Sequence, residues 1–286
     1  MSFNVLTSNR GAADFDPSVP GADVLLENRA PVMAAWIRSA GPDVIGLQEN
    51  EASSPDRLPL RALSPLLPGY TPVHGGLGVP LLVRDDAYSV ADSDALDISQ
   101  GHYTRHLAWL RLISPATGRE LLVANTHLDP YQRPEMAAAR SAEVAAIVTA
   151  LRRLSPDWRI PTLLLGDLNL RPDDPRPEYA SPLARLARAG LLDAARIART
   201  DASAVPGAAS VNGLGTRIDG RFRYRAIRTD GFRYDYAFVS PGLGVRSWQV
   251  VTGPGVRRIG GHRYFADGPV PSDHCPVQAE VSIPAR

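Results

Sequence analysis

Four short segments of the chain carry side chains that could do chemistry: residues 2–5, 47–49, 166–169 and 272–275. Each brings an Asn, Asp, Glu or His to the end of an apolar, strand-like run or next to one. Strand ends that face a crevice are where open α/β sheets assemble their sites. Carboxylates, amides and imidazoles without a competing nucleophile are what a Mg²⁺-assisted phosphoryl hydrolase needs. The pattern therefore predicts that chemistry.

The composition limits the class of protein. The chain has 286 residues, of which 44% are hydrophobic and 21% charged, as in an ordinary soluble globular protein. No run approaches the ~18 consecutive apolar residues that a membrane span requires. The single cysteine, Cys275, excludes an internal disulfide framework and suits a reducing compartment. Since no charged and then apolar leader begins the chain, we expect a cytoplasmic protein.

All 31 basic residues are arginines. A chain without lysine cannot use Schiff-base chemistry at a lysine, nor the P-loop lysine of nucleotide kinases. The formal net charge is only +1, so no global field steers the protein towards nucleic acid. Any nucleic-acid binding would need a local basic face.

The apolar pattern predicts short strands alternating with amphipathic helices. Helices are expected around residues 33–40 and 134–153, because apolar residues there share one helical face. Strands are expected at residues 43–47, 80–83, 107–113, 121–124, 162–165, 234–239 and 277–283. Residues 50–79, 171–182 and 200–232 are rich in Pro, Gly, Ser and Arg and are expected to be loops. The mixture favours a two-sheet α/β sandwich over a Rossmann fold, because no G-x-G-x-x-G follows the first strand.

The motifs together resemble the endonuclease/exonuclease/phosphatase superfamily, which includes deoxyribonuclease-I-like nucleases, neutral sphingomyelinases and inositol-polyphosphate 5-phosphatases. The matching stretches are residues 3–5, 42–49, 125–128, 166–169, 234–238 and 272–276, in the family's order. This resemblance implies an α/β fold, a four-layer α/β/β/α sandwich of two mostly antiparallel or mixed sheets. It also implies one catalytic domain spanning residues 1–286.

The resemblance implies a metal site with Mg²⁺, or alternatively Mn²⁺. Glu49 is expected to be the principal ligand, since Mg²⁺ takes few protein carboxylates and keeps several waters. Asn4 is expected to help hold the metal and the phosphate. Asp273 would lie beside the metal and bind it directly or through water.

The resemblance also implies the catalytic roles. Asp167 would orient or deprotonate the attacking water, and Asn169 would donate a hydrogen bond to the phosphoryl oxygen. An Asx-turn closing the strand is the structural alternative for that pair. His274 is expected to be the catalytic imidazole, with Asp235 fixing its tautomer. His127 would be a second phosphate contact.

Several arginines are weaker candidates for binding the substrate. Arg105 precedes a predicted strand, and Arg140 lies on what is predicted to be the polar side of the long helix, where a structural ion pair is the favoured role. Arg223 and Arg225 belong to an arginine-rich segment, residues 217–233, whose interleaved aromatics could stack a ring while the arginines grip phosphate. A solvated two-stranded excursion explains that segment equally well.

The remaining candidates are expected to be structural. They are His74, His102, His106 and His262, as loop or packing residues, and Cys275, as a small buried residue.

The sequence thus predicts a Mg²⁺- or Mn²⁺-dependent phosphoester hydrolase that acts by in-line attack of water. A small phosphorylated metabolite or a phosphodiester is the first substrate expectation, given the near-zero net charge. DNA or RNA is the alternative, favoured by the arginine-rich segment. A non-hydrolytic binding protein that keeps the fold is a further alternative. No membrane span and no obligate protein partner are expected.

Overall fold

The structure is a computed structural model that describes residues 1–8, 25–130, 133–213, 216–218, 221–223, 227–229, 232–259, 262–265 and 269–283. Its helices are α1 (Leu26–Ala40), α2 (Pro59–Leu63), α3 (Pro134–Leu154), α4 (Pro177–Arg188) and α5 (Ala194–Ile197), with single 3-10 turns at Pro55–Arg57, Ser64–Leu66 and Pro156–Trp158.

The first eight strands are β1 (Ser2–Asn4), β2 (Val44–Gln48), β3 (Tyr70–Val73), β4 (Leu81–Arg84), β5 (Ser89–Asp97), β6 (His106–Ile113), β7 (Glu120–His127) and β8 (Thr162–Asp167). The others are β9 (Leu192–Asp193), β10 (Thr200–Asp201), β11 (Thr216–Ile218), β12 (Arg221–Arg223), β13 (Asp235–Val239), β14 (Gly244–Val250), β15 (Arg257–Ile259), β16 (His262–Tyr264) and β17 (Val277–Ser282).

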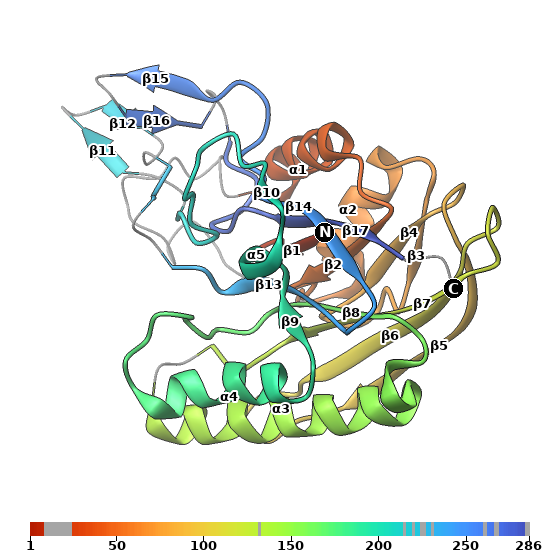
Figure 1. Cartoon of the computed structure of the whole chain (residues 1–286). Helices are drawn as coiled ribbons and strands as arrows, with labels where there is room; N and C mark the ends of the chain where they lie inside the picture. The colour runs from red at the N-terminus through yellow and green to blue at the C-terminus, as the bar shows by residue number, and fades with distance from the viewer. Residues whose placement is uncertain are drawn as a thin grey trace.

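Two large sheets form the centre of the molecule. One has seven strands in the order β10-β14-β17-β1-β2-β4-β3, and the other has six in the order β5-β6-β7-β8-β13-β9. Helices α1 and α2 lie on the outer side of the first sheet, and α3 and α4 cover the second (Figure 1). The expected α/β/β/α order of layers is therefore confirmed.

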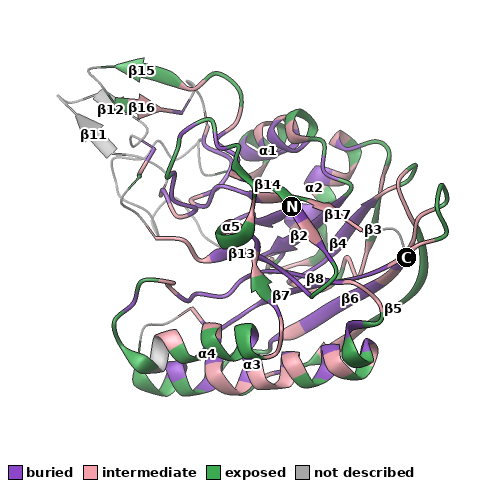
Figure 2. Ribbon diagram, in the orientation of Figure 1, coloured by how far each residue is buried: buried purple, intermediate pink, exposed green. Residues whose placement is uncertain are grey.

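The central strands β2, β7, β8 and β13 are buried along nearly their whole length, because both of their faces are covered (Figure 2). Along β6, Ala108, Leu110 and Leu112 belong to the core between the sheets. The alternate residues Leu107 and Trp109 pack in a second core against α3 and α4. Successive side chains of a strand point to opposite faces, so one strand contributes to both cores.

Strand pairing brings the chemical residues into rows. Asn4 on β1 lies beside Gln48 on the parallel strand β2, directly before Glu49. In the other sheet, His127 on β7 is paired with Asp167 on β8, and Asp167 is paired with Asp235 on β13. A single cross-strand row therefore carries an imidazole and two carboxyls.

A polar bridge crosses the core between the two sheets. Nε2 of Gln48 donates to Oδ1 of Asn125 over 2.7 Å, and Nδ2 of Asn125 donates to the carbonyls of Leu47 and Pro80. Position 46 is glycine because a Cβ there would lie 2.6 Å from Cγ of Asn125. Asn125 lies two residues before His127, and Gln48 directly precedes Glu49. The bridge therefore holds the segment that carries His127 against the segment that carries Glu49.

Most of the expected elements are confirmed, but the loop predictions are partly wrong. Residues 50–79 include α2 and β3, residues 171–182 include the start of α4, and residues 200–232 include the short strands β10, β11 and β12. Strands β5 and β14 were not expected. The strand at residues 234–239 comes second to last among the predicted strands, but β14, β15 and β16 separate it from the last one. Within the described part of the chain, no helix combines the length and apolarity needed to cross a membrane.

Candidate active site

Asp167 lies at the centre of the candidate site. As the last residue of β8, it is buried between β7 and β13. Its Oδ2 accepts a hydrogen bond from Nδ2 of Asn4 over 3.0 Å and lies 3.7 Å from Nδ1 of His274 and 3.8 Å from Nε2 of His127. Asn4, His127 and His274 thus meet around one carboxyl, with Asn4 arriving from the other sheet.

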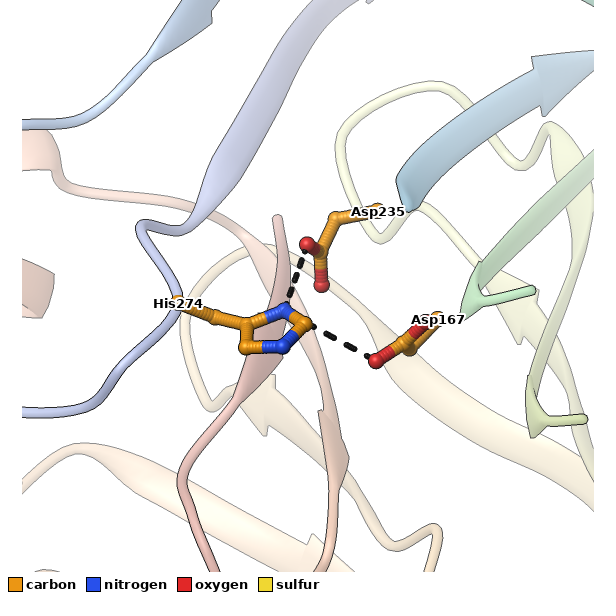
Figure 3. A group of neighbouring side chains, drawn as sticks. All are labelled: Asp167, Asp235 and His274. Atoms are coloured by element: carbon orange, nitrogen blue, oxygen red, sulfur yellow. Dashed lines mark hydrogen bonds and ion pairs between the residues drawn. The ribbon is translucent and has the colours of Figure 1, made fainter. Parts of the chain in front are cut away.

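His274 and Asp235 form the expected pair. Nδ1 of His274 donates to Oδ2 of Asp235 over 2.8 Å, and Figure 3 shows the imidazole held between Asp235 and Asp167. Burial alone would lower the pKa of the imidazole. The charges of Asp235, Asp167 and Asp273, together with the hydrogen bond to Asp235, outweigh it and raise the pKa well above its ordinary value. His274 is therefore cationic at neutral pH, with Nε2 left for another partner.

The carboxyl of Asp167 is harder to ionise than an ordinary aspartate. Burial and the nearby charge of Asp235 raise its pKa, against the opposing effect of His274, His127 and Asn4. An acid so placed can accept a proton closer to neutral pH than a free carboxylate does.

Asn169 adopts a left-handed backbone conformation, with φ at 51°. Its backbone N–H donates to Oδ1 of Asp167 over 2.9 Å, so the Asx-turn considered from the sequence is present. Its side-chain Nδ2 lies 3.1 Å from Nε2 of His127 and donates to the Leu128 carbonyl over 3.0 Å. In this arrangement Asn169 orients His127.

His127 is the buried partner on β7. Burial lowers the pKa of its ring, and the nearby Arg105 charge adds to this effect while Asp167 opposes it. A neutral imidazole whose Nε2 accepts from Asn169 carries its proton on Nδ1. That atom is buried and has no hydrogen-bond partner among the described residues.

Glu49 follows β2 and also has a left-handed backbone, with φ at 58°. Its Oε1 accepts from Nδ2 of Asn4 and its Oε2 from the backbone N–H of Thr7, each over 3.0 Å. Burial would raise the pKa of this carboxyl, but His127, the Thr7 amide and Asn4 outweigh it and lower the pKa. A strained conformation for a glutamate, held by several contacts, is typical of functional sites.

Asn4 contacts the site through its amide nitrogen. Its Oδ1 accepts from the backbone N–H of Leu6 over 3.0 Å, while Nδ2 reaches both Glu49 and Asp167. Asn4 therefore holds two carboxyls in place.

The sequence reasoning missed Arg29, a buried arginine of α1. Its guanidinium donates to the carbonyls of Val5, Leu6 and Pro271, which joins the end of β1 to the segment before Ser272. Burial lowers the pKa of Arg29 to about 10, against the nearby charges of Asp273 and Glu49. The missed signal is that Arg29 occupies the same helical face as Ala30, Met33 and Ile37, which are all buried.

The donor set suits a hard divalent cation. Glu49 and Asp273 are both half-buried, and the charges of both act on Arg29. The buried atom Oδ1 of Asp235 has no hydrogen-bond partner in the described part of the chain. The carboxylate oxygens of Glu49 and Asp273 are of the kind that Mg²⁺ prefers as ligands. One ligand atom each from Asp167, Asp235 and His274 also lies within 4.8 Å of the others, although the hydrogen bond between His274 and Asp235 occupies that trio.

One known protein family matches nearly the whole chain. The model of the Endonuclease/Exonuclease/phosphatase family matches residues 1–274. The chain belongs to this family. Members of the endonuclease/exonuclease/phosphatase family hydrolyse phosphoesters, and the protein is therefore a phosphoester hydrolase. The family is generally dependent on divalent metals. No curated protein matches the chain in sequence.

Solved structures share the endonuclease/exonuclease/phosphatase fold at low identity. A family protein from Bacteroides thetaiotaomicron is 21% identical, with a TM-score of 0.74 over 100% of this chain and 97% of that chain. The mannosyl-6-phosphatase Bt3783 of Bacteroides thetaiotaomicron is 20% identical, with a TM-score of 0.71 over 98% of both chains. D. rerio TDP2 complexed with single strand DNA product is 16% identical, with a TM-score of 0.63 over 98% of this chain and 97% of that chain.

The other arginines considered from the sequence do not lie together at the candidate site. Arg225 lies outside the described residues, and the side chain of Arg223 is not described. Arg233 pairs with Asp193, with NH1 donating to Oδ1 over 3.0 Å, so it is a structural ion pair. Arg140 is fully buried, which corrects its expected place on a polar helix face.

The other residues expected to be structural lie outside the cluster around Asp167. The four histidines His74, His102, His106 and His262 are not among its contacts. Cys275 is 1% exposed, and burial raises the pKa of its thiol. A buried thiol of this kind is a poor nucleophile.

Proposed function

We propose that this phosphoester hydrolase uses a divalent metal, Mg²⁺ or Mn²⁺, and an activated water to cleave the phosphoester of a small metabolite. The observation that supports it is the position of Asp167. One carboxyl lies within 4 Å of Asn4, His127 and His274, each from a different strand or loop. Such a cluster can position a water and a phosphate together.

Glu49 and Asp273 would hold the metal, and Asn4 and the Thr7 amide would keep the Glu49 carboxylate aimed at it. When bound, the metal supplies charge neutralisation at the phosphate and at the leaving oxygen. The residues around the metal would position the water, accept its proton and contact the phosphate.

Asp167 would orient the attacking water and accept its proton, for which its raised pKa is suited. His274 would donate from Nε2 to a phosphoryl oxygen as negative charge develops there, while Asp235 keeps Nδ1 protonated. His127, held by Asn169, would be a second phosphate contact. The attack would be in line, without a covalent intermediate.

A small substrate is favoured over nucleic acid by two observations. The formal net charge is only +1, so no global field attracts a polyanion. Of the solved structures above, the mannosyl-6-phosphatase has a higher TM-score than TDP2 with single strand DNA, 0.71 against 0.63. Nuclease activity is the second candidate.

A substrate panel tests this function. Sugar phosphates, nucleotides, phosphodiesters, sphingomyelin, inositol phosphates, and single- and double-stranded DNA would be incubated with Mg²⁺ or Mn²⁺. We expect metal-dependent phosphate release from a small phosphoester, reduced about 10²-fold or more by Asp167→Asn. Asp157→Asn, in an exposed turn, serves as the matched control. Cleavage of DNA alone would favour the nuclease, and full activity in excess chelator would exclude the mechanism.

A further inference from the structure

A small pocket with both polar and apolar lining adjoins the candidate site on the side of His127. It has a volume of about 210 Å³ and is lined by residues that include Glu51, Gly76, Gly78, Thr104, Arg105 and His127. Pockets for drug-sized ligands are usually about 300–1,000 Å³. This one accommodates a group of roughly one ring, at a place where the alcohol part of a bound phosphoester could extend.

Arg105 brings a positive charge to this pocket without a direct ion pair among the described residues. Its side chain is only 6% exposed, yet among the described residues it forms no ion pair, and its buried Nε has no hydrogen-bond partner. Its guanidinium packs over the ring of Tyr103, 5.1 Å from the centroid. Buried polar groups are normally satisfied by hydrogen bonds, so a guanidinium in this state is a candidate to bind a ligand.

Glu51 supplies an acceptor on the same pocket. Its carboxylate packs against Gly78, where a Cβ would lie 3.0 Å from Oε1, so glycine leaves room for it. Glu51 and Arg105 line the same pocket but do not form an ion pair in the described structure. The pocket therefore presents a donor group and an acceptor group that are both available.

This combination selects among substrate groups. An anionic group would be attracted by Arg105 but repelled by Glu51, and an apolar ring would leave both charged groups without partners. A group with neighbouring hydroxyls satisfies both, because each hydroxyl can accept from the guanidinium and donate to the carboxylate.

We propose that this pocket binds the alcohol part of the substrate as a sugar ring or a compact polyol, with Arg105 donating to its hydroxyls and Glu51 accepting from them. This inference rests on the proposed function and narrows its substrate to polyhydroxylated phosphoesters. Arg105 and Glu51 are specificity residues in it. The bond that breaks is the phosphoester bond next to His127 and Asp167.

The experiment compares three phosphoesters in the presence of Mg²⁺: glucose 6-phosphate, phenyl phosphate without hydroxyls, and 3-phosphoglycerate with a carboxylate. For Glu51→Gln we expect kcat/KM for glucose 6-phosphate to fall about tenfold, mainly through KM, as when a charged hydrogen bond is lost. The ratio to phenyl phosphate should fall with it, and 3-phosphoglycerate should improve because a repulsive charge is gone. Arg105→Gln should weaken both glucose 6-phosphate and 3-phosphoglycerate.

Matched controls are Glu280→Gln and Arg246→Gln, an exposed ion pair between β17 and β14 that lies away from the pocket. They should leave the order of the three substrates unchanged. Thermal unfolding of every variant checks that the fold is retained. An unchanged substrate ratio in Glu51→Gln, or a wild-type preference for 3-phosphoglycerate, would overturn the proposal.

A binding measurement separates this proposal from the proposed function. Calorimetric titration of glucose 6-phosphate into the Asp167→Asn protein reports the pocket without turnover. Binding that is weakened about tenfold by adding Glu51→Gln supports the pocket even if no substrate is hydrolysed. Equal affinity with and without Glu51→Gln refutes the pocket even if hydrolysis of other phosphoesters is established.

Discussion

Asp167 and Asp235 face each other in register across β8 and β13, and both carboxyls approach the same ring nitrogen of His274, at 3.7 and 2.8 Å. Two acids that share one imidazole cannot act independently of each other. Asp235 stabilises the protonated ring, and its charge in turn raises the pKa of Asp167. The row therefore couples the group expected to accept a proton with the group expected to donate one.

The first prediction concerns this coupling. Asp235→Asn and His274→Ala should each reduce kcat strongly, and the double variant should be little worse than His274→Ala alone, since Asp235 is expected to act through the ring. Steady-state kinetics of the three variants form the double-mutant cycle. Losses that multiply fully would show that the two residues work separately.

Glu49 carries the second prediction. Glu49→Gln keeps the shape of the side chain but removes its charge, so Mg²⁺ affinity and activity should both fall at least tenfold. Calorimetric metal titration gives a readout that does not require turnover. Glu27→Gln, on the exposed side of α1, is the control. Wild-type metal affinity in Glu49→Gln would assign the metal to other ligands, such as the trio around His274.

Glu143 makes stability depend on pH. Burial raises its pKa to about 7, against the nearby charges of Arg105 and Arg140 and the Asp129 amide. The ionised form is therefore disfavoured in the folded state. The stabilisation of the folded state by the protonated Glu143 carboxyl is fully present below the pKa of 4.5 in the unfolded chain. It is lost as pH rises through the folded-state pKa of about 7.

The free energy of unfolding should fall by roughly 2–3 kcal/mol between pH 5 and pH 8 relative to Glu143→Gln, at about 1.4 kcal/mol per pKa unit. Urea denaturation of both proteins across this range measures the difference. If the two stability curves run parallel, Glu143 is not protonated in the folded protein at pH 5 or is equally solvated in both states.

Arg29 is predicted to be intolerant of lysine. An ammonium is a point donor on a flexible stem and cannot reach the three carbonyls that the guanidinium fork contacts. Arg29→Lys should cost about 2–4 kcal/mol of unfolding free energy, because buried carbonyls lose their partners. Arg61→Lys, in an exposed ion pair on α2, should cost less than about 0.5 kcal/mol. Equal unfolding free energies for the two variants would contradict this account.

The fold was largely predictable because most strands are covered on both faces and so read as apolar runs. Strand β5 is not predicted by the apolar pattern because it is an edge strand whose residues are mostly exposed. Four of its residues before Ala95 are polar. Helix α4 was hidden by its prolines, Pro177 in the first turn and Pro182 within it, which on sequence alone favour a loop. In β14 a bulge between Val245 and Ser247 interrupts the alternation.

The sequence was enough to predict which residues form the candidate site. It was not enough to predict the contacts between their side chains. Motifs at strand ends were enough to predict that Asp167, Asp235 and His274 gather. The direction of each side chain depends on residues far away in the chain, which no local pattern contains. The amide of Asn4 turns towards the carboxyls because Leu6 occupies its oxygen, and Asn169 turns to His127 because that ring lies beside it.

The bridge between Gln48 and Asn125 means that the two halves of the site are aligned from inside the protein. Glu49 belongs to one sheet and His127 to the other, so their separation depends on how far the sheets slide over each other. A substitution of Asn125, which is fully buried, would shift that alignment while leaving both halves chemically intact. We expect such a protein to retain metal and phosphate affinity yet turn over slowly.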